Sequence, residues 1–296
     1  MNLGLSTFFF VNEKLGTQHL SLVKEAGIEK IEVMHHPSHF KYDDVEQVSF
    51  VAKEAKNLGI KIVSMHAPGE WMGGERWDLS CPSNQWAIYE AKKVIDTLEL
   101  LGGSILVIHL KVERLNDGEQ RLVSLHHNIT EIVEYCEKKN IILGVENVTP
   151  EALSFVSRFN TRNIGIVLDT HHTVSFVDHI YPPLPSLLKT IKKCGNKLIY
   201  VHANDVIKIS ERNIKSLMHY PGVADKAKEY VERGKIVVHL LPYDGIIDWK
   251  VIAQTLEENR YKGIFLIEPC PVFPQFRKKI LKMMTKRFKR CKALEG

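Results

Sequence analysis

Short apolar runs that end on a histidine or a carboxylate recur along the chain. Seven segments share this pattern, at residues 30–32, 62–66, 105–109, 141–146, 164–169, 198–202 and 264–268. Apolar runs of this length, without alternation of polar and apolar positions, indicate strands that are buried on both faces. A carboxylate at the edge of a core is costly unless it is paired or binds a metal. The repeated polar endings therefore indicate a common site.

Between these runs lie segments in which apolar residues recur at helical spacing. A further strand is expected at 3–6, and helices at about 15–26, 43–58, 83–101, 122–139, 151–159, 184–194 and 248–259. Eight alternations of strand and helix are typical of a parallel sheet covered by helices, and no Gly-x-Gly-x-x-Gly follows the first strand to suggest a dinucleotide fold. We therefore predict an α/β fold, a single (β/α)8 TIM barrel, in which the strand ends converge on one mouth.

Two segments depart from the regular alternation. Residues 204–245, after the seventh strand, form an insertion of about 40 residues, longer than an ordinary loop and therefore expected to be functional. The barrel is expected to occupy residues 1–273, and residues 274–296 to form a basic C-terminal helix or tail. From 277 to 296 the chain carries nine Lys or Arg and one Glu, so residues 1–276 carry about −3 of the net +5.

Residues 277–288 have the pattern of an amphipathic basic helix. Ile280, Leu281, Met284 and Phe288 would dock such a helix on the barrel and leave its charges in solvent. A basic face also suits nucleic acid, anionic lipid or a partner protein in an assembly. The sequence leaves these alternatives open.

The composition is that of a globular protein, with 44% hydrophobic and 25% charged residues. No apolar stretch approaches the roughly 20 residues that span a bilayer, and the N-terminus has no basic leader. We therefore expect a cytoplasmic protein with no membrane partner. The five cysteines are scattered, without a Cys-x-x-Cys pair, which argues against a thiolate zinc site and a disulfide framework.

Strands five to eight, which are neighbours on one side of the barrel, end on Glu146, Asp169, His202 and Glu268. Three carboxylates and one imidazole suit a divalent ion such as Mn²⁺, Zn²⁺, Co²⁺ or Mg²⁺. No Lys or Arg occupies a strand end, which argues against a set of buried ion pairs. The sequence therefore predicts one metal site.

Other strand ends and loops supply further candidates. His66 and His109 end the adjacent strands three and four, opposite Glu146, and either complete a second metal site that Glu146 bridges or bind substrate hydroxyls. His172 and His239 form a third candidate cluster.

Aromatic and acidic residues complete the candidate set. Trp71 and Trp77 lie in the loop after the third strand, where they either cover a substrate or pack within the loop. Glu32 ends a short run and is a candidate substrate-binding or supporting group.

The combined pattern resembles the xylose-isomerase-like superfamily over nearly the whole chain, up to about Pro269. The residues that carry the resemblance are Glu146-Asn147, Asp169-Thr170-His171-His172, His202-Ala203-Asn204-Asp205 and His239 followed by Gly245. This superfamily joins sugar isomerases and epimerases to the endonuclease IV family of abasic-site nucleases. The resemblance implies a metal-dependent barrel with Glu146, Asp169, His202 and Glu268 as its shared metal site.

The isomerase branch, which needs one divalent ion, is the function we expect first. It implies isomerisation or epimerisation of a sugar, sugar phosphate or related polyol through a metal-stabilised enediolate. Glu146 and Glu268 would remove and return the proton, and His66 and His172 would orient hydroxyls. The expected partner is a small sugar-like molecule, and the oligomeric state, including a homo-oligomer, stays open.

The alternative is an endonuclease IV-like, zinc-dependent nuclease that acts on abasic sites in DNA. In that branch up to three Zn²⁺ are expected, held by His66, His109 and Glu146, by the four-residue site, and by His172 with His239. The chain departs from the branch in two places, because Val237 stands where the family has Asp and residues 109–111 lack the His-Pro-Gly after strand four. These departures affect the third zinc site most and favour the isomerase branch.

Overall fold

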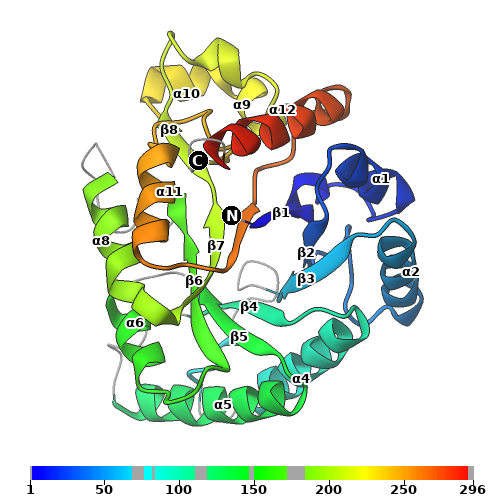
Figure 1. Cartoon of the computed structure of the whole chain (residues 1–296), viewed down its shortest axis with the longest axis vertical. Helices are drawn as coiled ribbons and strands as arrows, with labels where there is room; N and C mark the ends of the chain where they lie inside the picture. The colour runs from blue at the N-terminus through cyan, green and yellow to red at the C-terminus, as the bar shows by residue number, and fades with distance from the viewer. Residues whose placement is uncertain are drawn as a thin grey trace.

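Eight parallel strands close into a barrel in the order β1-β10-β7-β6-β5-β4-β3-β2 (Figure 1). The computed structural model describes residues 2–68, 77–81, 84–110, 119–146, 150–171 and 184–292. The barrel strands are β1 (Asn2–Ser6), β2 (Lys30–Met34), β3 (Lys61–His66), β4 (Ile105–His109), β5 (Ile142–Glu146), β6 (Ile164–Asp169), β7 (Leu198–Ala203) and β10 (Ile264–Ile267). The predicted (β/α)8 barrel is confirmed.

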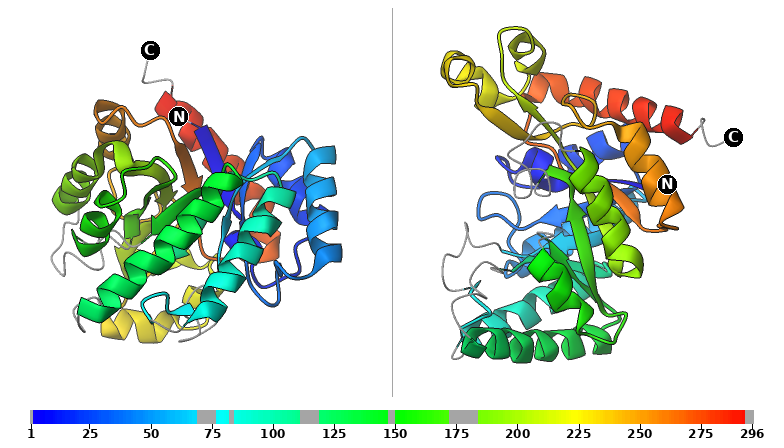
Figure 2. Two further views of the ribbon diagram at one scale, coloured as in Figure 1. Left: turned by 90° about the horizontal axis from the view of Figure 1, so that it is seen from below. Right: turned by 90° about the vertical axis from the view of Figure 1, so that its left-hand side faces the viewer.

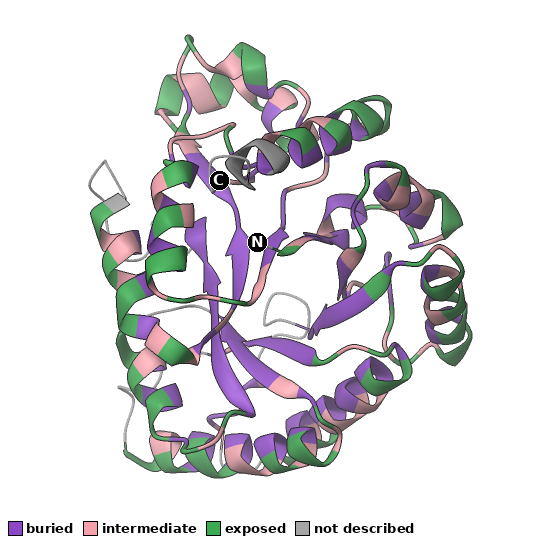
Figure 3. Cartoon of the chain, in the orientation of Figure 1, coloured by how far each residue is buried: buried purple, intermediate pink, exposed green. Residues whose placement is uncertain are grey.

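Helices cover the outside of the barrel (Figure 2). They are α1 (Thr17–Glu25), α2 (Val45–Asn57), α4 (Gln85–Leu100), α5 (Glu119–Lys138), α6 (Pro150–Ser157), α8 (Leu184–Cys194) and α11 (Trp249–Glu258), with short 3-10 helices η1 (Thr7–Phe10) and η4 (Gly195–Lys197). Local chemistry sets their ends: Asp44 caps α2 by accepting a hydrogen bond from the Gln47 N–H at 3.0 Å, and Gly59 follows it with a φ of 63°. Buried residues line the inner helix faces and exposed ones the outer faces (Figure 3).

Side chains two residues before the strand ends fill the barrel interior below the mouth. Because side chains alternate between the two faces of a strand, these residues point inward as the strand ends do. Val107, Val167, Tyr200 and Leu266 belong to one buried cluster. Gly144 leaves room for Val167, whose Cγ2 lies 2.6 Å from the place that a Cβ would take. The side chains at the strand ends therefore lie above a layer of closely packed, buried side chains.

The insertion after the seventh strand folds as a β-hairpin with helical turns at its tip. β8 (Asp205–Lys208) pairs antiparallel with β9 (Ile236–Leu240), and η5 (Ile214–Leu217), α9 (Pro221–Ala224) and α10 (Ala227–Arg233) lie between them. Asp205 is fully buried. Its carboxylate accepts hydrogen bonds from the backbone N–H groups of Val206, Tyr243, Ile246 and Ile247 and from the indole of Trp249. One carboxylate thus joins the hairpin to the 243–247 turn and to α11.

Replacing Asp205 with alanine is expected to lower the free energy of unfolding by at least about 3 kcal/mol, because several buried donors lose their acceptor. Asp248→Ala is the matched control. Asp248 is exposed and caps α11 by accepting hydrogen bonds from the Lys250 and Val251 N–H groups, so its loss should cost about 1 kcal/mol. Urea unfolding followed by circular dichroism measures the free energy of unfolding of both variants. Equal losses of this free energy in the two variants would contradict the role of Asp205.

The C-terminal helix α12 (Pro274–Lys292) packs beside α1, at the top of Figure 1. Leu281 and Met284 are fully buried, and Ile280 and Phe288 are nearly so, as the apolar stripe in the sequence predicts. We propose that residues 274–296 are a docked appendage of a barrel that spans 1–273. Within the described ranges, no helix is both long and apolar enough to cross a bilayer.

Ion pairs attach α12 at three points, one of which joins Lys278 to Glu25 of α1 at 2.8 Å. Arg277 is buried, with its guanidinium 2.5 Å from Glu13 Oε1 and over the ring of Phe10. Arg287 Nη1 lies 3.2 Å from Oδ1 of Asp244, near the end of the insertion. The basic helix therefore uses part of its charge to bind the barrel.

Glu13 is expected to make the stability of this contact depend on pH. The hydrogen bond and charge of Arg277, with help from His19 and against the effect of burial, lower the Glu13 pKa from 4.5 to about 2. A lowered pKa in the folded state stabilises the fold above the unfolded value, and this contribution is lost as the pH falls from 4.5 toward 2. The difference in free energy of unfolding between the wild type and Glu13→Gln should therefore shrink between about pH 6 and pH 3. If urea titrations give the same difference in free energy of unfolding across this pH range, the role of Glu13 is contradicted.

Candidate metal centre at the barrel mouth

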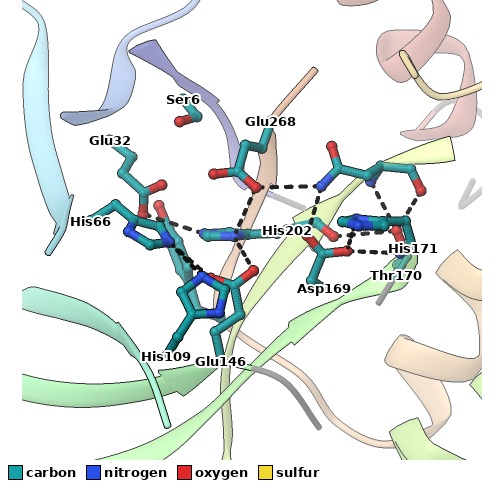
Figure 4. Close-up of polar contacts among 12 residues, drawn as sticks. Ser6, Glu32, His66, His109, Glu146, Asp169, Thr170, His171, His202 and Glu268 are labelled. Carbon is teal, nitrogen blue, oxygen red and sulfur yellow. Dashed lines mark hydrogen bonds and ion pairs between the residues drawn. The ribbon is translucent and has the colours of Figure 1, made fainter. Parts of the chain in front are cut away.

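Four strand ends bring the predicted metal ligands to one point. Glu146 ends β5, Asp169 ends β6 in register with His202 of β7, and Glu268 directly follows β10. One donor atom from each residue lies within 4.8 Å of the other three. All four side chains are buried, and Figure 4 shows them gathered around His202.

The imidazole of His202 lies among carboxylates. Its Nδ1 is 3.2 Å from Glu146 Oε1 and 3.3 Å from Glu268 Oε2. Its Nε2 is 3.3 Å from Glu32 Oε2. Both ring nitrogens therefore face acidic oxygens in a fully buried position.

Burial and neighbouring charges act in opposite directions on these groups. Burial lowers the pKa of His202, but the surrounding carboxylates, with Glu268 the strongest, hold that pKa well above its usual value. Burial raises the pKa of Glu146, but the charges of His202 and His109 hold it well below the usual value. Burial is the largest influence on Glu268 and raises its pKa. The charges of His202 and of the neighbouring acids thus counteract the effect of burial on both His202 and Glu146.

The donor set fits a divalent cation. Ionised carboxylates at this depth need a compensating positive charge. Among the described residues the one buried Lys or Arg is Arg277, which pairs with Glu13. Three carboxylates and one imidazole suit Mn²⁺, Zn²⁺, Co²⁺ or Mg²⁺. The residues that would hold the ion are Glu146, Asp169, His202 and Glu268.

A second cluster shares Glu146 with the first. His66 Nε2 lies 3.0 Å from His109 Nε2 and 3.1 Å from Glu146 Oε2, and His109 Nε2 lies 3.3 Å from the same oxygen. Burial lowers the pKa of His66, but the hydrogen bond and charge of Glu146 raise it to about 9. Glu146 joins the two clusters, because its Oε1 faces His202 and its Oε2 faces the two histidines. This geometry is compatible with both sequence hypotheses, a second metal ion or a group that binds hydroxyls.

The third cluster consists of Asp169, His171 and His239. His171 Nδ1 lies 2.8 Å from Asp169 Oδ1, and the rings of His171 and His239 have centroids 4.0 Å apart. His239 was predicted to lie with His172, which is outside the described residues, and His171 was not among the predicted site residues. The apolar pattern carries no signal for the direction of the His171 side chain. His239 has a φ of 54°, a costly conformation for a residue other than glycine.

Glu32 is not a strand end, contrary to the prediction. β2 continues for two residues beyond it, and Glu32 points into the barrel, fully buried. It accepts a hydrogen bond from Ser64 Oγ at 2.8 Å, and the Tyr200 hydroxyl lies 2.8 Å from the same Oγ. Ser64 and Tyr200 were not among the site residues predicted from the sequence. Their signal was the spacing of two residues before His66 and His202, which places them on the same strand face.

Three further positions remain to be compared with the predictions from the sequence. Asn204, which it gave no role, donates through its side-chain amide to Asp169 Oδ2 at 2.7 Å and to Glu268 Oε2 at 3.4 Å. Trp71 lies outside the described residues. Trp77 packs edge-to-face against Trp86, with ring centroids 5.5 Å apart, and lines a small pocket next to His109.

Known proteins of similar sequence and structure share this fold. The model of a protein family described as "xylose isomerase-like TIM barrel" matches residues 20–286. A D-psicose 3-epimerase of Enterocloster bolteae is 20% identical over 272 residues, which cover 85% of this chain and 76% of that protein.

Solved structures give the same result for the fold. The D-psicose 3-epimerase of Clostridium cellulolyticum H10, solved with D-tagatose, superposes with a TM-score of 0.70 at 15% identity over 98% of both chains. A D-tagatose 3-epimerase-like protein gives 0.71 at 17% identity over 100% of both chains. The IOLI protein with a bound zinc atom gives 0.66 at 17% identity over 99% of this chain and 97% of that one. Identities this low establish the fold alone.

Proposed function

Because this chain belongs to the xylose isomerase-like TIM barrel family, we propose that it is a divalent-metal-dependent epimerase or isomerase of a sugar or a related polyol. The observation that carries the proposal is the pair of buried acids, Glu146 and Glu268, on either side of His202 Nδ1 within one set of four donors. The sugar epimerases among the proteins of similar sequence and fold support the choice of substrate class.

The proposed cofactor is one ion of Mn²⁺, Zn²⁺, Co²⁺ or Mg²⁺, held by Glu146, Asp169, His202 and Glu268. The zinc atom in the IOLI structure supports metal binding by barrels of this shape. A bound divalent ion supplies positive charge where negative charge develops on the carbonyl oxygen of the substrate.

Glu146 and Glu268 are proposed to transfer the proton. Epimerisation at the carbon next to a carbonyl requires that a proton leave one face of the carbon and that another arrive on the opposite face. Two carboxyl groups on different strands serve this purpose if each can reach the carbon within hydrogen-bonding distance. One carboxylate oxygen accepts the proton while the C–H electron pair moves toward the carbonyl. The second carboxyl group then returns a proton, so the substrate is neither oxidised nor reduced.

The neighbouring histidines are proposed to bind hydroxyls. His66 and His109 contact Glu146 Oε2 and would place their ring N–H groups beside the substrate. His172 and Trp71 keep the roles that the sequence suggests, orienting a hydroxyl and covering the sugar.

The two additional clusters are the observation that favours a second candidate, a zinc-dependent abasic-site endonuclease. Clustered metal ions stabilise both the attacking and the leaving oxygen in phosphodiester cleavage. Three of the four similar proteins described above carry the names of epimerases or of an epimerase-like protein, and this favours the first candidate. A duplex DNA with one abasic site, incubated with the Zn²⁺-loaded protein, should stay intact. A nick that Glu146→Gln abolishes would make the nuclease the leading function.

The direct test is a sugar panel. Protein stripped of metal is reloaded with each candidate ion and incubated with ketoses that include D-psicose, D-tagatose and L-ribulose, the sugars named in the similar structures. We expect at least one ketose to yield its carbon-3 epimer or an aldose isomer, and a chelator to stop the reaction. If no pairing of ion and sugar gives product, the proposal is wrong.

A further inference from the structure

A chain of buried side chains runs across the barrel interior beneath the proposed metal centre. Tyr200 of β7 reaches across the barrel to Ser64 of β3, with the two oxygens 2.8 Å apart. Ser64 Oγ donates to Glu32 Oε2 of β2 at 2.8 Å, and the same oxygen lies 3.3 Å from His202 Nε2. All four residues are fully buried.

The directions of the hydrogen bonds follow from the number of protons that are available. Ser64 has one O–H, which it donates to the carboxylate of Glu32, so the hydroxyl of Tyr200 must donate to Ser64. A carboxylate only accepts, so the contact between Glu32 and His202 requires a proton on Nε2. The nitrogen that remains is Nδ1, which faces Glu146 and Glu268.

We propose that Glu32, oriented by Ser64 and Tyr200, is a positioning residue that fixes the tautomer and ring direction of His202 so that Nδ1 is presented to the metal ion. The inference rests on the proposed function in one respect, the binding of a divalent ion by His202. It assigns Glu32 a structural task rather than contact with the sugar, and it gives a role to two side chains that touch no substrate.

The cost of burying Glu32 supports this assignment. Its Oε1 is buried without a hydrogen-bond partner among the described residues, and no described Lys or Arg forms an ion pair with it. A carboxylate in such a place lowers the stability of the fold. The hydrogen bond to an imidazole N–H, which orients a metal ligand and makes it more basic, is a gain that offsets this cost.

The test is the affinity for the metal, measured by competition with a chelating dye. Glu32→Gln should raise the Kd for Zn²⁺ about 10- to 100-fold, because the amide can also turn its NH₂ toward Nε2 and favour the wrong tautomer. Ser64→Ala should change Kd in the same direction by a smaller factor, and Tyr200→Phe by the smallest. Ser64→Ala also provides a variant with little loss of volume if Glu32→Gln fails to fold.

Matched controls separate positioning from a general loss of stability. Glu90 is a buried glutamate on α4 that contacts Lys93 and Tyr42, and Tyr261 donates its hydroxyl to the Ile264 carbonyl. Glu90→Gln and Tyr261→Phe should leave the Kd unchanged. In Zn²⁺-loaded protein labelled with ¹⁵N-histidine, the proton of His202 should appear on Nε2.

The possible results separate this inference from the proposed function. The proposal is overturned if Glu32→Gln and Ser64→Ala bind Zn²⁺ as the wild type does, if Glu90→Gln weakens binding equally, or if the wild type binds no divalent ion. The predicted order of Kd values supports the positioning role of Glu32 even if no sugar is converted. Failure to convert any sugar would contradict the proposed function alone.

Discussion

Glutamine in place of Glu146 is expected to lower kcat at least about 1,000-fold, because an amide cannot take a proton from carbon and general base catalysis alone contributes 10²- to 10⁴-fold. Glu146 also carries the contacts that join the four-residue site to His66 and His109. Its replacement should therefore affect both chemistry and metal binding. The measurement is kcat at saturating metal on whichever ketose the sugar panel identifies.

Glu90→Gln is the matched control for this variant, since Glu90 is a buried glutamate on the outside of the barrel. Its kcat should stay within about twofold of the wild type. Glu268→Gln should resemble Glu146→Gln, because both acids are proposed to exchange protons with the substrate. Full activity in Glu146→Gln would refute its role as a base.

Replacing His202 with alanine is expected to remove most of the bound metal and, with it, the activity. The imidazole supplies the nitrogen donor, and it separates Glu32 from Glu146 and Glu268. Without the imidazole the ion loses the only nitrogen among its four donors, so the affinity for the ion should fall by at least about 100-fold. Elemental analysis of protein purified without chelators measures the ion content per chain.

His126→Ala is the control for that variant. His126 is exposed on α5 and stacks on Phe159, with ring centroids 4.8 Å apart. Its replacement should leave the metal content unchanged. A His202→Ala protein with one tightly bound ion per chain would show that the proposed ligand set is wrong.

The main lines of the fold and the centre of the site were predictable because they depend on short-range patterns. Apolar runs and helical spacing define the alternation of strands and helices, and a parallel barrel brings every strand end to one mouth. Glu146, Asp169 and His202 could therefore be placed together from the sequence. Glu268 could be added because successive strands of such a barrel are neighbours, and the last strand therefore pairs with the seventh.

Features that depend on register across the barrel could not be predicted. Glu32 looked like a strand end because the apolar run before it is short, and only the paired strands show that it faces Ser64 inside the barrel. The contact between Tyr200 and Ser64 joins strands that are not neighbours. The position of His171 beside His239 depends on the local backbone, about which periodicity holds no information.

The C-terminal helix also has features that the sequence predicts and features that it does not. The stripe of Ile280, Leu281, Met284 and Phe288 predicted a docked helix, and the structure buries these residues. The acids that receive its arginines, Glu13 and Asp244, lie far away in the sequence and carry no signal of their role.

The central claim is that metal-dependent proton transfer occurs at the carbon next to a ketose carbonyl. Its most direct test is incubation of the metal-loaded protein with a substrate ketose in D₂O, followed by proton nuclear magnetic resonance. We expect the signal of the proton at carbon 3 or carbon 1 to disappear as deuterium replaces it, and to persist when a chelator is present or when Glu146 is replaced by glutamine. A product that forms without any incorporation of deuterium, in wild type and variant alike, would contradict the claim.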